Sequence, residues 1–243
     1  MDFPAAPCGT SRKRDTLDDR VRARGRPSVR EVGGLDTTRS ERTSEEWLLP
    51  LPPPAELVTV THVRGNLMAT SREQLRASGR FAEYDRHLSP AVRSQLDSAL
   101  TTMWYPLDVA HEHYAAVDRL ALAEPEIIRM TDEVAAKLSG AFMQTMSSML
   151  RTTGLTPWDI MPFYGRVWRR LFVGGALAVA RQGPKDARIA IVANPLLKHR
   201  YLRIGLSRHL VIGIQFLVAK RAYVRELSAD PALGRAEFLL QWV

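Results

Sequence analysis

The last third of the chain, residues 157–243, contains the order of elements that most restricts the fold. An amphipathic helix is predicted over 157–172 and another over 199–219, and each is followed by a pair of short alternating segments typical of β-strands. Strands with one apolar face bury it by pairing with one another and packing against helices. The pattern therefore predicts an antiparallel sheet of four to five strands, formed mainly by this third of the chain, with helices on one face.

The strand segments are separated by residues that favour turns. They are predicted over 176–181, 188–193, 222–225 and 235–242. Gln182–Asp186 contains Gly and Pro and has the composition of a hairpin loop. In the last segment the alternation places four apolar side chains on the inward face, Ala236, Phe238, Leu240 and Trp242.

The first part of the chain has a different character. Residues 1–55 are predicted to be a disordered tail with a proline-rich spacer, because Gly, Pro, Ser, Thr and mixed charges dominate without periodicity. Residues 56–243 are predicted to form one α+β domain, whose first half, 56–156, is mainly helical. An opening strand is expected over 57–63 as a further member of the sheet. The helices of this half are predicted over 67–77, 90–102, 106–122 and 125–151.

The helix predicted over 125–151 carries an apolar stripe at three- and four-residue spacing. Its members are Ile127, Met130, Val134, Leu138, Phe142, Met146 and Met149. A stripe of this length can pack against the core or against a second copy of the chain. We therefore predict a homodimer through this helix, with core packing as the alternative.

The sequence also gives an expectation for the cellular compartment of the protein. The chain has 243 residues and one cysteine, Cys8, which cannot form an intramolecular disulfide and so favours a reducing compartment. The longest uncharged apolar run, Leu210–Ala219, is shorter than the ~20 residues that span a bilayer. The first residues carry charges in place of the apolar core of a secretion signal. A cytoplasmic location without a membrane span is expected.

The net charge of +8 is concentrated in residues 157–243, which hold fourteen Lys and Arg against five Asp and Glu. A basic surface attracts nucleic acid, anionic lipid or an acidic partner. The alternative is a solubilising surface without a specific partner. Nucleic-acid association through the C-terminal unit is therefore kept as an alternative function.

Several short motifs resemble a known group of domains. Gly174-Gly175 ends a helix, a strand hairpin follows, and Asn194-Pro195 leads through Tyr201–Leu206 into a glycine-containing helix and two closing strands. This order resembles 4-vinyl-reductase-type domains and their haem-NO-binding-like relatives. Through Val63-Arg64-Gly65 and Trp104-Tyr105-Pro106 the chain also resembles an uncharacterised paralogous family abundant in myxobacteria, which implies a bacterial protein.

The resemblance implies a sensory or ligand-binding module with a pocket between helices and sheet. The haem-binding relatives carry a Tyr-x-Ser-x-Arg signature, whereas the nearest segment here, Tyr164-Gly-Arg166, lacks the serine and the spacing. Several 4-vinyl-reductase-type domains carry cysteines near the C-terminus, and this chain has none there. No haem, metal or other cofactor is therefore expected.

Candidate site residues lie around the two C-terminal helices. Tyr164, Trp168, Tyr201 and His209 are predicted to line the ligand pocket. Gly205 and Gly213 are costly inside a helix, by about 1 kcal/mol each, and are expected where the helix approaches the sheet or a ligand closely. The basic residues at the start of this helix, Lys198, Arg200 and Arg203, are predicted to bind an anion, or alternatively to form an exposed face.

No motif predicts catalysis or metal binding. His111 and His113 are two residues apart and point to different sides of a helix, so they cannot bind one ion together. We therefore predict a non-catalytic cytoplasmic sensory or adaptor module that binds a small apolar ligand or a protein partner. The alternatives are a nucleic-acid-associated protein and an enzyme of unassigned class.

Overall fold

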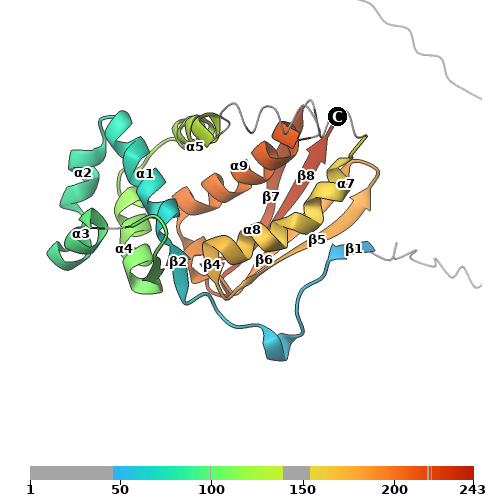
Figure 1. Cartoon of the computed structure of the whole chain (residues 1–243), viewed down its shortest axis with the longest axis horizontal. Helices are drawn as coiled ribbons and strands as arrows, with labels where there is room; N and C mark the ends of the chain where they lie inside the picture. The colour runs from blue at the N-terminus through green and yellow to red at the C-terminus, as the bar shows by residue number, and fades with distance from the viewer. Residues whose placement is uncertain (1–45, 99, 139–153, 218, 220) are drawn as a thin grey trace, which may run out of the picture. The chain divides into compact units, whose positions relative to one another are not determined.

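The computed structural model describes residues 46–98, 100–138, 154–217, 219 and 221–243. Within these residues the chain is an α+β fold (Figure 1) whose main sheet has five strands in the order β1-β5-β6-β8-β7, all antiparallel to their neighbours. The strands are β1 (Glu46–Leu49), β5 (Ala176–Gly183), β6 (Asp186–Val192), β7 (Ala222–Asp230) and β8 (Arg235–Trp242). The predicted fold class is confirmed, including the dominance of the C-terminal third in the sheet.

Most helices belong to the first half of the chain. They are α1 (Gly65–Ala77), α2 (Phe81–Arg86), α3 (Pro90–Asp97), α4 (Leu107–Asp118) and α5 (Glu124–Leu138), followed by α7 (Pro157–Ile160), α8 (Tyr164–Leu171) and α9 (Arg200–Leu217). Short 3-10 helices occur at Pro54–Glu56, Met161–Phe163 and Pro195–Lys198. α9 packs on β7 and β8, and α8 packs on β5. None of the described helices has both the length and the hydropathy needed to cross a bilayer.

The two faces of the main sheet differ as the strand alternation predicts. On the face toward the helices, β8 contributes Ala236, Phe238 and Leu240, all fully buried, and Trp242 packs edge-on against Trp158 of α7 with ring centroids 4.6 Å apart. The opposite face carries the ion pair between Arg188 and Glu237, 3.3 Å from Nε to Oε2. The helices therefore cover the apolar face.

The fifth strand of the main sheet is not the one expected. The prediction of a strand over 57–63 in this sheet is wrong, because β2 (His62–Arg64) instead pairs with β3 (Trp104–Pro106) and β4 (Phe172–Val173) in a separate three-stranded sheet. The fifth strand is β1, from a segment expected to be disordered. Leu48 and Leu49 pack on the core, which gives this short strand its stabilisation.

The described part of α5 packs within the chain. Ile127 and Met130 are almost fully buried, and α5 lies against α9. These two members of the predicted dimer stripe therefore belong to the core of a single chain. Phe142, Met146 and Met149 lie outside the described residues, and the homodimer stays a prediction.

The entry into β5 depends on glycines. Gly174 has φ +88°, and a Cβ built on it would lie 2.4 Å from the carbonyl oxygen of Thr59. The N–H of the next residue, Gly175, donates a hydrogen bond to the carbonyl of Val58 at 2.6 Å. The segment before β2 therefore crosses this turn in direct backbone contact, which leaves no room for a side chain.

We predict that Gly174→Ala lowers the free energy of unfolding by about 3 kcal/mol or more, because it combines a left-handed backbone with a clash against a peptide group. Gly79→Ala is the matched control, since Gly79 has φ +73° but a Cβ added to it would meet no described atom within 4 Å. It should cost about 1 kcal/mol from backbone strain alone. Urea denaturation of both variants measures the difference, and equal losses would contradict the crossing.

Candidate functional site

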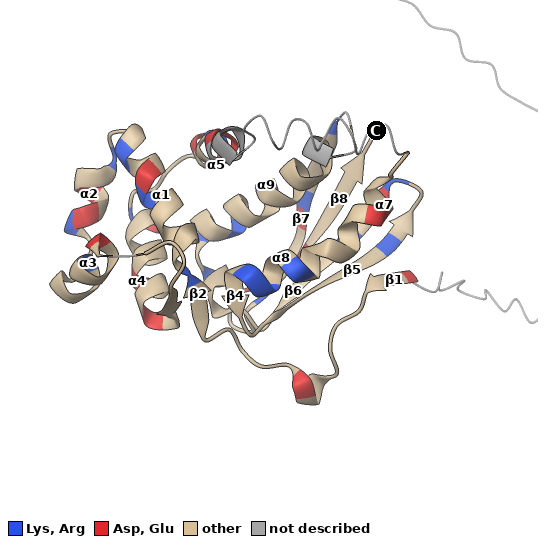
Figure 2. Ribbon diagram, in the orientation of Figure 1, with Lys and Arg blue, Asp and Glu red and all other residues tan. Residues whose placement is uncertain are grey.

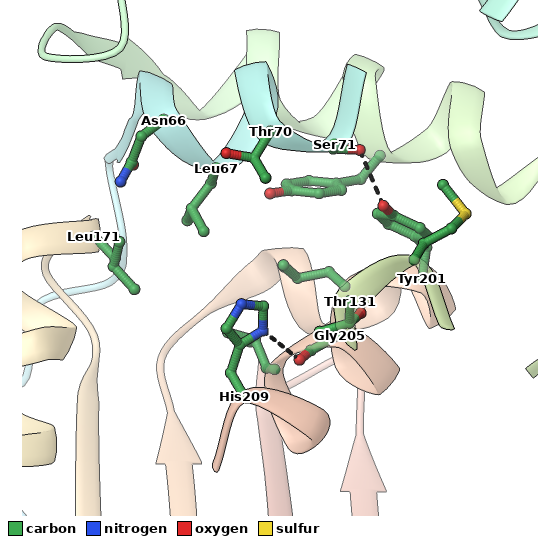
Figure 3. Close-up of a pocket in the computed structure, with 13 residues that line it drawn as sticks. Asn66, Leu67, Thr70, Ser71, Thr131, Leu171, Tyr201, Gly205 and His209 are labelled. Carbon is green, nitrogen blue, oxygen red and sulfur yellow. Dashed lines mark hydrogen bonds between the residues drawn. The ribbon is translucent and has the colours of Figure 1, made fainter. Parts of the chain in front are cut away.

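A cavity of about 190 Å³ lies between the N-terminal helices and α9. α1 contributes Asn66, Leu67, Thr70 and Ser71. α9 contributes Tyr201, Leu202, Gly205, Leu206 and His209. The remaining wall is formed by Tyr114 of α4, Met130 and Thr131 of α5, and Leu171 of α8. The site thus brings together residues from five helices that are distant in sequence (Figure 3).

The lining is uncharged. It consists of aliphatic side chains, hydroxyl groups, one amide and one imidazole, without a Lys, Arg, Asp or Glu among the described lining residues. Burying an ion without a partner costs much more free energy than burying a neutral polar group. The cavity therefore suits neutral molecules.

His209 presents one defined ring nitrogen to the cavity. Its Nδ1 lies 2.7 Å from the carbonyl oxygen of Gly205, and because a carbonyl only accepts, Nδ1 carries the proton. Desolvation lowers the pKa of His209, opposed by this hydrogen bond and by Asp132. The side chain of His209 is nevertheless exposed to solvent, although surrounding protein atoms form a concave surface around it. In Figure 3 the other ring nitrogen, Nε2, faces the space below Leu67 and Thr70. A neutral His209 thus offers Nε2 as a hydrogen-bond acceptor.

Two tyrosines contribute hydroxyl groups. Ser71 Oγ donates a hydrogen bond to the hydroxyl of Tyr201 at 3.2 Å. Tyr114 is 2% exposed, yet no hydrogen bond joins its hydroxyl to any residue that the structure describes. Burial raises the pKa of Tyr114 and of Tyr201, so both hydroxyls keep their protons at neutral pH. A buried tyrosine hydroxyl normally has a partner.

Of the four residues predicted to line the pocket, Tyr201 and His209 line this cavity, and Tyr164 and Trp168 lie outside it. The hydroxyl of Tyr164 donates to the carbonyl of Leu210 at 2.8 Å, which joins α8 to α9. Nε1 of Trp168 donates to the carbonyl of Gly174 at 3.1 Å. These two side chains hold α8 in place, and their polar atoms already have partners. The ligand-binding role of Tyr201 and His209 stays a prediction.

The predicted anion-binding residues meet protein groups. The carboxylate of Asp118 accepts hydrogen bonds from the backbone N–H of Arg200 at 3.0 Å and of Tyr201 at 2.8 Å, so it occupies the start of α9. Burial would raise the pKa of Asp118, but hydrogen bonds from His199 and from these backbone groups outweigh it and hold the pKa below its usual value. Lys198 is exposed.

Arg200 and Arg203 line a separate groove of about 520 Å³ between α9 and β7. Arg203 pairs with Glu226 at 3.3 Å, and Arg200 donates to the carbonyl of Leu122 at 2.8 Å. This groove is larger than the cavity, but its arginines face acidic side chains of the same chain. It is therefore a weaker candidate for a ligand site, and the predicted anion role stays untested.

His111 and His113 of α4 have different partners, as their two-residue spacing on a helix predicts. His113 is fully buried and bonds through Nδ1 to the hydroxyl of Tyr84 at 2.7 Å, whereas His111 Nδ1 lies 3.1 Å from Nε2 of His199. Among the described residues no group of three or more His, Cys, Asp or Glu is arranged to hold a metal ion. Desolvation, followed by the charges of Arg72 and His199, lowers the pKa of His113 to about 3.

Sequence reasoning missed Tyr114, Ser71 and Asp118. Tyr114 belongs to the apolar stripe of α4, and a side chain in such a stripe indicates core packing, not a cavity wall. Ser71 and Asp118 matter through contacts with α9, which begins more than eighty residues after Asp118. No local pattern predicts such pairs.

Comparisons with known proteins agree at the level of the fold. No family profile and no curated protein matches the sequence. The Fe(II) unliganded H-NOX protein from K. algicida matches with TM-score 0.52 and 6% identity, over 74% of this chain and 96% of that one. A point variant of it matches with TM-score 0.53, the same identity and the same coverage. An oxygen-binding H-NOX domain related to soluble guanylate cyclases is a more distant match, with TM-score 0.47 and 13% identity over 74% of this chain and 94% of that one.

The described fold is therefore H-NOX-like. This agrees with the haem-NO-binding part of the resemblance, whereas the structural matches do not support the 4-vinyl-reductase part. At 6% identity the likeness concerns the fold and leaves the ligand open.

We predict that the free energy of unfolding falls as the pH is lowered from about 6.5 towards 3. The pKa of His113 is depressed in the folded state, so its contribution to stability is complete above the unfolded value and is lost as unfolding takes up a proton. The expected slope is about 1.4 kcal/mol per pH unit for one such group. His113→Gln, which does not titrate, should flatten the profile by this amount. Urea denaturation between pH 7.5 and about 4 measures both slopes, and parallel profiles would contradict the buried neutral histidine.

Proposed function

We propose that the protein is a non-catalytic sensory or adaptor module, cytoplasmic as the sequence predicts, which binds a small molecule in the cavity beside α9. The observation that supports this most directly concerns Gly205. Its position lines the cavity, and a Cβ built there would meet nothing closer than Thr131 Oγ1 at 3.8 Å. A glycine inside a helix costs about 1 kcal/mol against alanine, so the chain maintains open space here at a cost in stability.

Gly213, the other glycine of α9, has closely packed surroundings, in contrast to Gly205. A Cβ on Gly213 would lie 3.3 Å from the hydroxyl of Tyr164 and 3.4 Å from its Cε1, so this glycine is explained by close packing of α8 on α9. Both glycines were expected to compensate their cost by close approach. Only Gly213 does so among the described neighbours, which leaves ligand space as the proposed reason for Gly205.

The volume of the cavity limits the ligand. Small apolar cavities of about 150 Å³ are known to admit benzene, and this one measures about 190 Å³. Drug-sized ligands occupy larger sites, of about 300 Å³ and more. The proposed ligand is therefore of the size of one small ring.

Haem does not fit the described cavity. Structures of the H-NOX family are described as containing haem, but a tetrapyrrole is many times larger than the benzene that a cavity of this order admits. The described lining also offers no Lys or Arg to pair with propionate groups. The proposal keeps the H-NOX-like architecture and assigns it a smaller, neutral ligand.

A third interpretation, an enzyme of unassigned class, has one point in its favour. Tyr114, Tyr201 and His209 are titratable groups with shifted pKa values that face one cavity, which is an arrangement found in acid–base sites. All three shifts favour the uncharged forms, which serve hydrogen bonding to a neutral ligand. Since no carboxylate, lysine or cysteine accompanies them in the described lining, binding is the better-supported function.

The nucleic-acid alternative depends on α8. Arg166, Arg169 and Arg170 of this helix are exposed and form no ion pair with any residue in the described part of the chain. Figure 2 shows blue segments along α8. Electrophoretic mobility of random DNA and RNA at two salt concentrations distinguishes the functions. Binding that weakens steeply with salt and is lost in Arg169→Ala/Arg170→Ala would support the alternative.

The proposed function predicts that toluene, used as a neutral probe, raises the melting temperature of the full chain by about 4 °C at ten times its dissociation constant. Leu67→Trp fills the cavity and should abolish this shift, because Leu67 projects into it (Figure 3). Leu233→Trp is the matched control, since Leu233 is 71% exposed and outside the cavity, and it should keep the shift. Mass spectrometry of an organic extract of purified protein then identifies any natural occupant.

A wild-type protein that releases no small molecule and shows no shift with toluene would refute the proposal. Gly205→Ala provides a graded form of the same test. It should raise the free energy of unfolding by up to about 1 kcal/mol while weakening toluene binding. A gain in stability with unchanged binding would show that the space beside Gly205 is not used.

A further inference from the structure

Resting on the proposed function, we infer that the ligand of this cavity is a compact, uncharged molecule with an apolar ring and one hydroxyl or N–H group that donates a hydrogen bond to Nε2 of His209. Phenol has this chemistry in its simplest form. The inference goes beyond the presence of a cavity, because it fixes the charge of the ligand and the direction of one hydrogen bond.

The direction follows from Gly205. The carbonyl oxygen 2.7 Å from Nδ1 of His209 fixes the proton on that nitrogen, so the other ring nitrogen has a lone pair and no proton. The Nε2 lone pair is not bonded to any residue that the structure describes. A ligand that meets it must therefore bring a donor. A carbonyl or ether would leave two acceptors facing each other.

Tyr114 supplies the complementary group. Its hydroxyl belongs to a side chain that is 2% exposed, lines the cavity and has no hydrogen-bond partner among the described residues. A hydroxyl on the wall of the cavity can bond to a molecule that occupies it, whether a ligand or water. The hydroxyl of Tyr114 can donate a hydrogen bond, and a hydroxyl on the ligand can accept one as well as donate one. The polar walls thus favour a hydroxyl over an N–H group.

The surrounding charges exclude an anionic version of the same ring. Arg208, the cation next to His209 in the sequence of α9, is held by both carboxylate oxygens of Asp132, at 2.5 and 3.0 Å, and does not line the cavity. A carboxylate on the ligand would therefore enter without a counterion and meet the Nε2 lone pair of His209. Both effects oppose binding.

Apolar side chains from several helices surround the space for the body of the ligand, with Leu202 and Leu206 of α9 among them. Leu67 approaches from α1, Leu171 from the end of α8, and Met130 from α5. Met is unbranched and adapts to the outline of a ring. A ring with a single polar group fits this division of the walls, with aliphatic groups around the body and Nε2 of His209 as the acceptor for its donor.

The test compares phenol, toluene and benzoate by calorimetric titration of the full chain at pH 8, where phenol is neutral and benzoate is charged. Phenol should bind about tenfold more tightly than toluene, the gain of one well-formed hydrogen bond. Benzoate should show no binding in the range where toluene binds. His209→Leu should remove most of the preference for phenol without weakening toluene, and Tyr114→Phe should weaken phenol alone.

Toluene serves as the control for folding in each variant, because its binding requires the cavity and no hydrogen bond. His209→Gln offers an amide oxygen as acceptor and should restore part of the preference for phenol. Equal affinities for phenol and toluene in the wild-type chain would overturn the inference while leaving the proposed function intact. Tighter binding of benzoate would overturn the inference as well. Absence of binding by both neutral probes would overturn the inference together with the proposed function.

Discussion

The carboxylate of Asp118 is the contact on which the arrangement of the site depends. It lies at the end of α4 and accepts hydrogen bonds from the first backbone N–H groups of α9, while Nδ1 of His199 lies 3.4 Å from Oδ2, the oxygen that also accepts from Arg200. A carboxylate at a helix N-terminus satisfies free donors and complements the helix dipole. Tyr114 is one turn before Asp118 on α4, and Tyr201 is the residue whose N–H it accepts. Their rings lie 6.4 Å apart as neighbouring walls of the cavity. One ionic cap thus places both tyrosines.

α8 and α9 meet further along α9, away from this cap. Tyr164 fills the space left by Gly213 and bonds to the carbonyl of Leu210, so α8 and α9 approach closely at one point. Eight residues earlier, at Gly205, no side chain fills the corresponding space. Close packing at one glycine and open space at the other are two consequences of the same rigid crossing. A cavity between stiff helices persists because interiors do not collapse freely.

The sheet could be predicted from the sequence more fully than the site. The alternation from Arg235 to Trp242 predicted the bounds and the inward face of β8, because a strand with one buried face has apolar residues at every second position. β1 could not be found in this way, since Trp47-Leu48-Leu49 is too short to show a period and is stabilised by pairing with β5. Likewise, the apolar stripe of α4 indicates that Tyr114 is buried. Whether its hydroxyl finds a partner depends on which side chains of α1 and α9 lie opposite, and only the tertiary structure determines that.

A ligand in this cavity would act on two segments that are already joined. Leu171 lines the cavity and is followed directly by β4, while Leu67 lines it three residues after the end of β2. β2 and β4 pair with each other through Val63 and Phe172, both almost fully buried. A change in the distance between Leu67 and Leu171 would therefore strain the short ladder of backbone hydrogen bonds between β2 and β4. Local contacts of this kind have a few discrete arrangements, and a ligand that fits one of them better shifts the population toward it. The proposed ligand would therefore act first on the small β2-β3-β4 sheet, which lies next to the cavity in the sequence through both leucines.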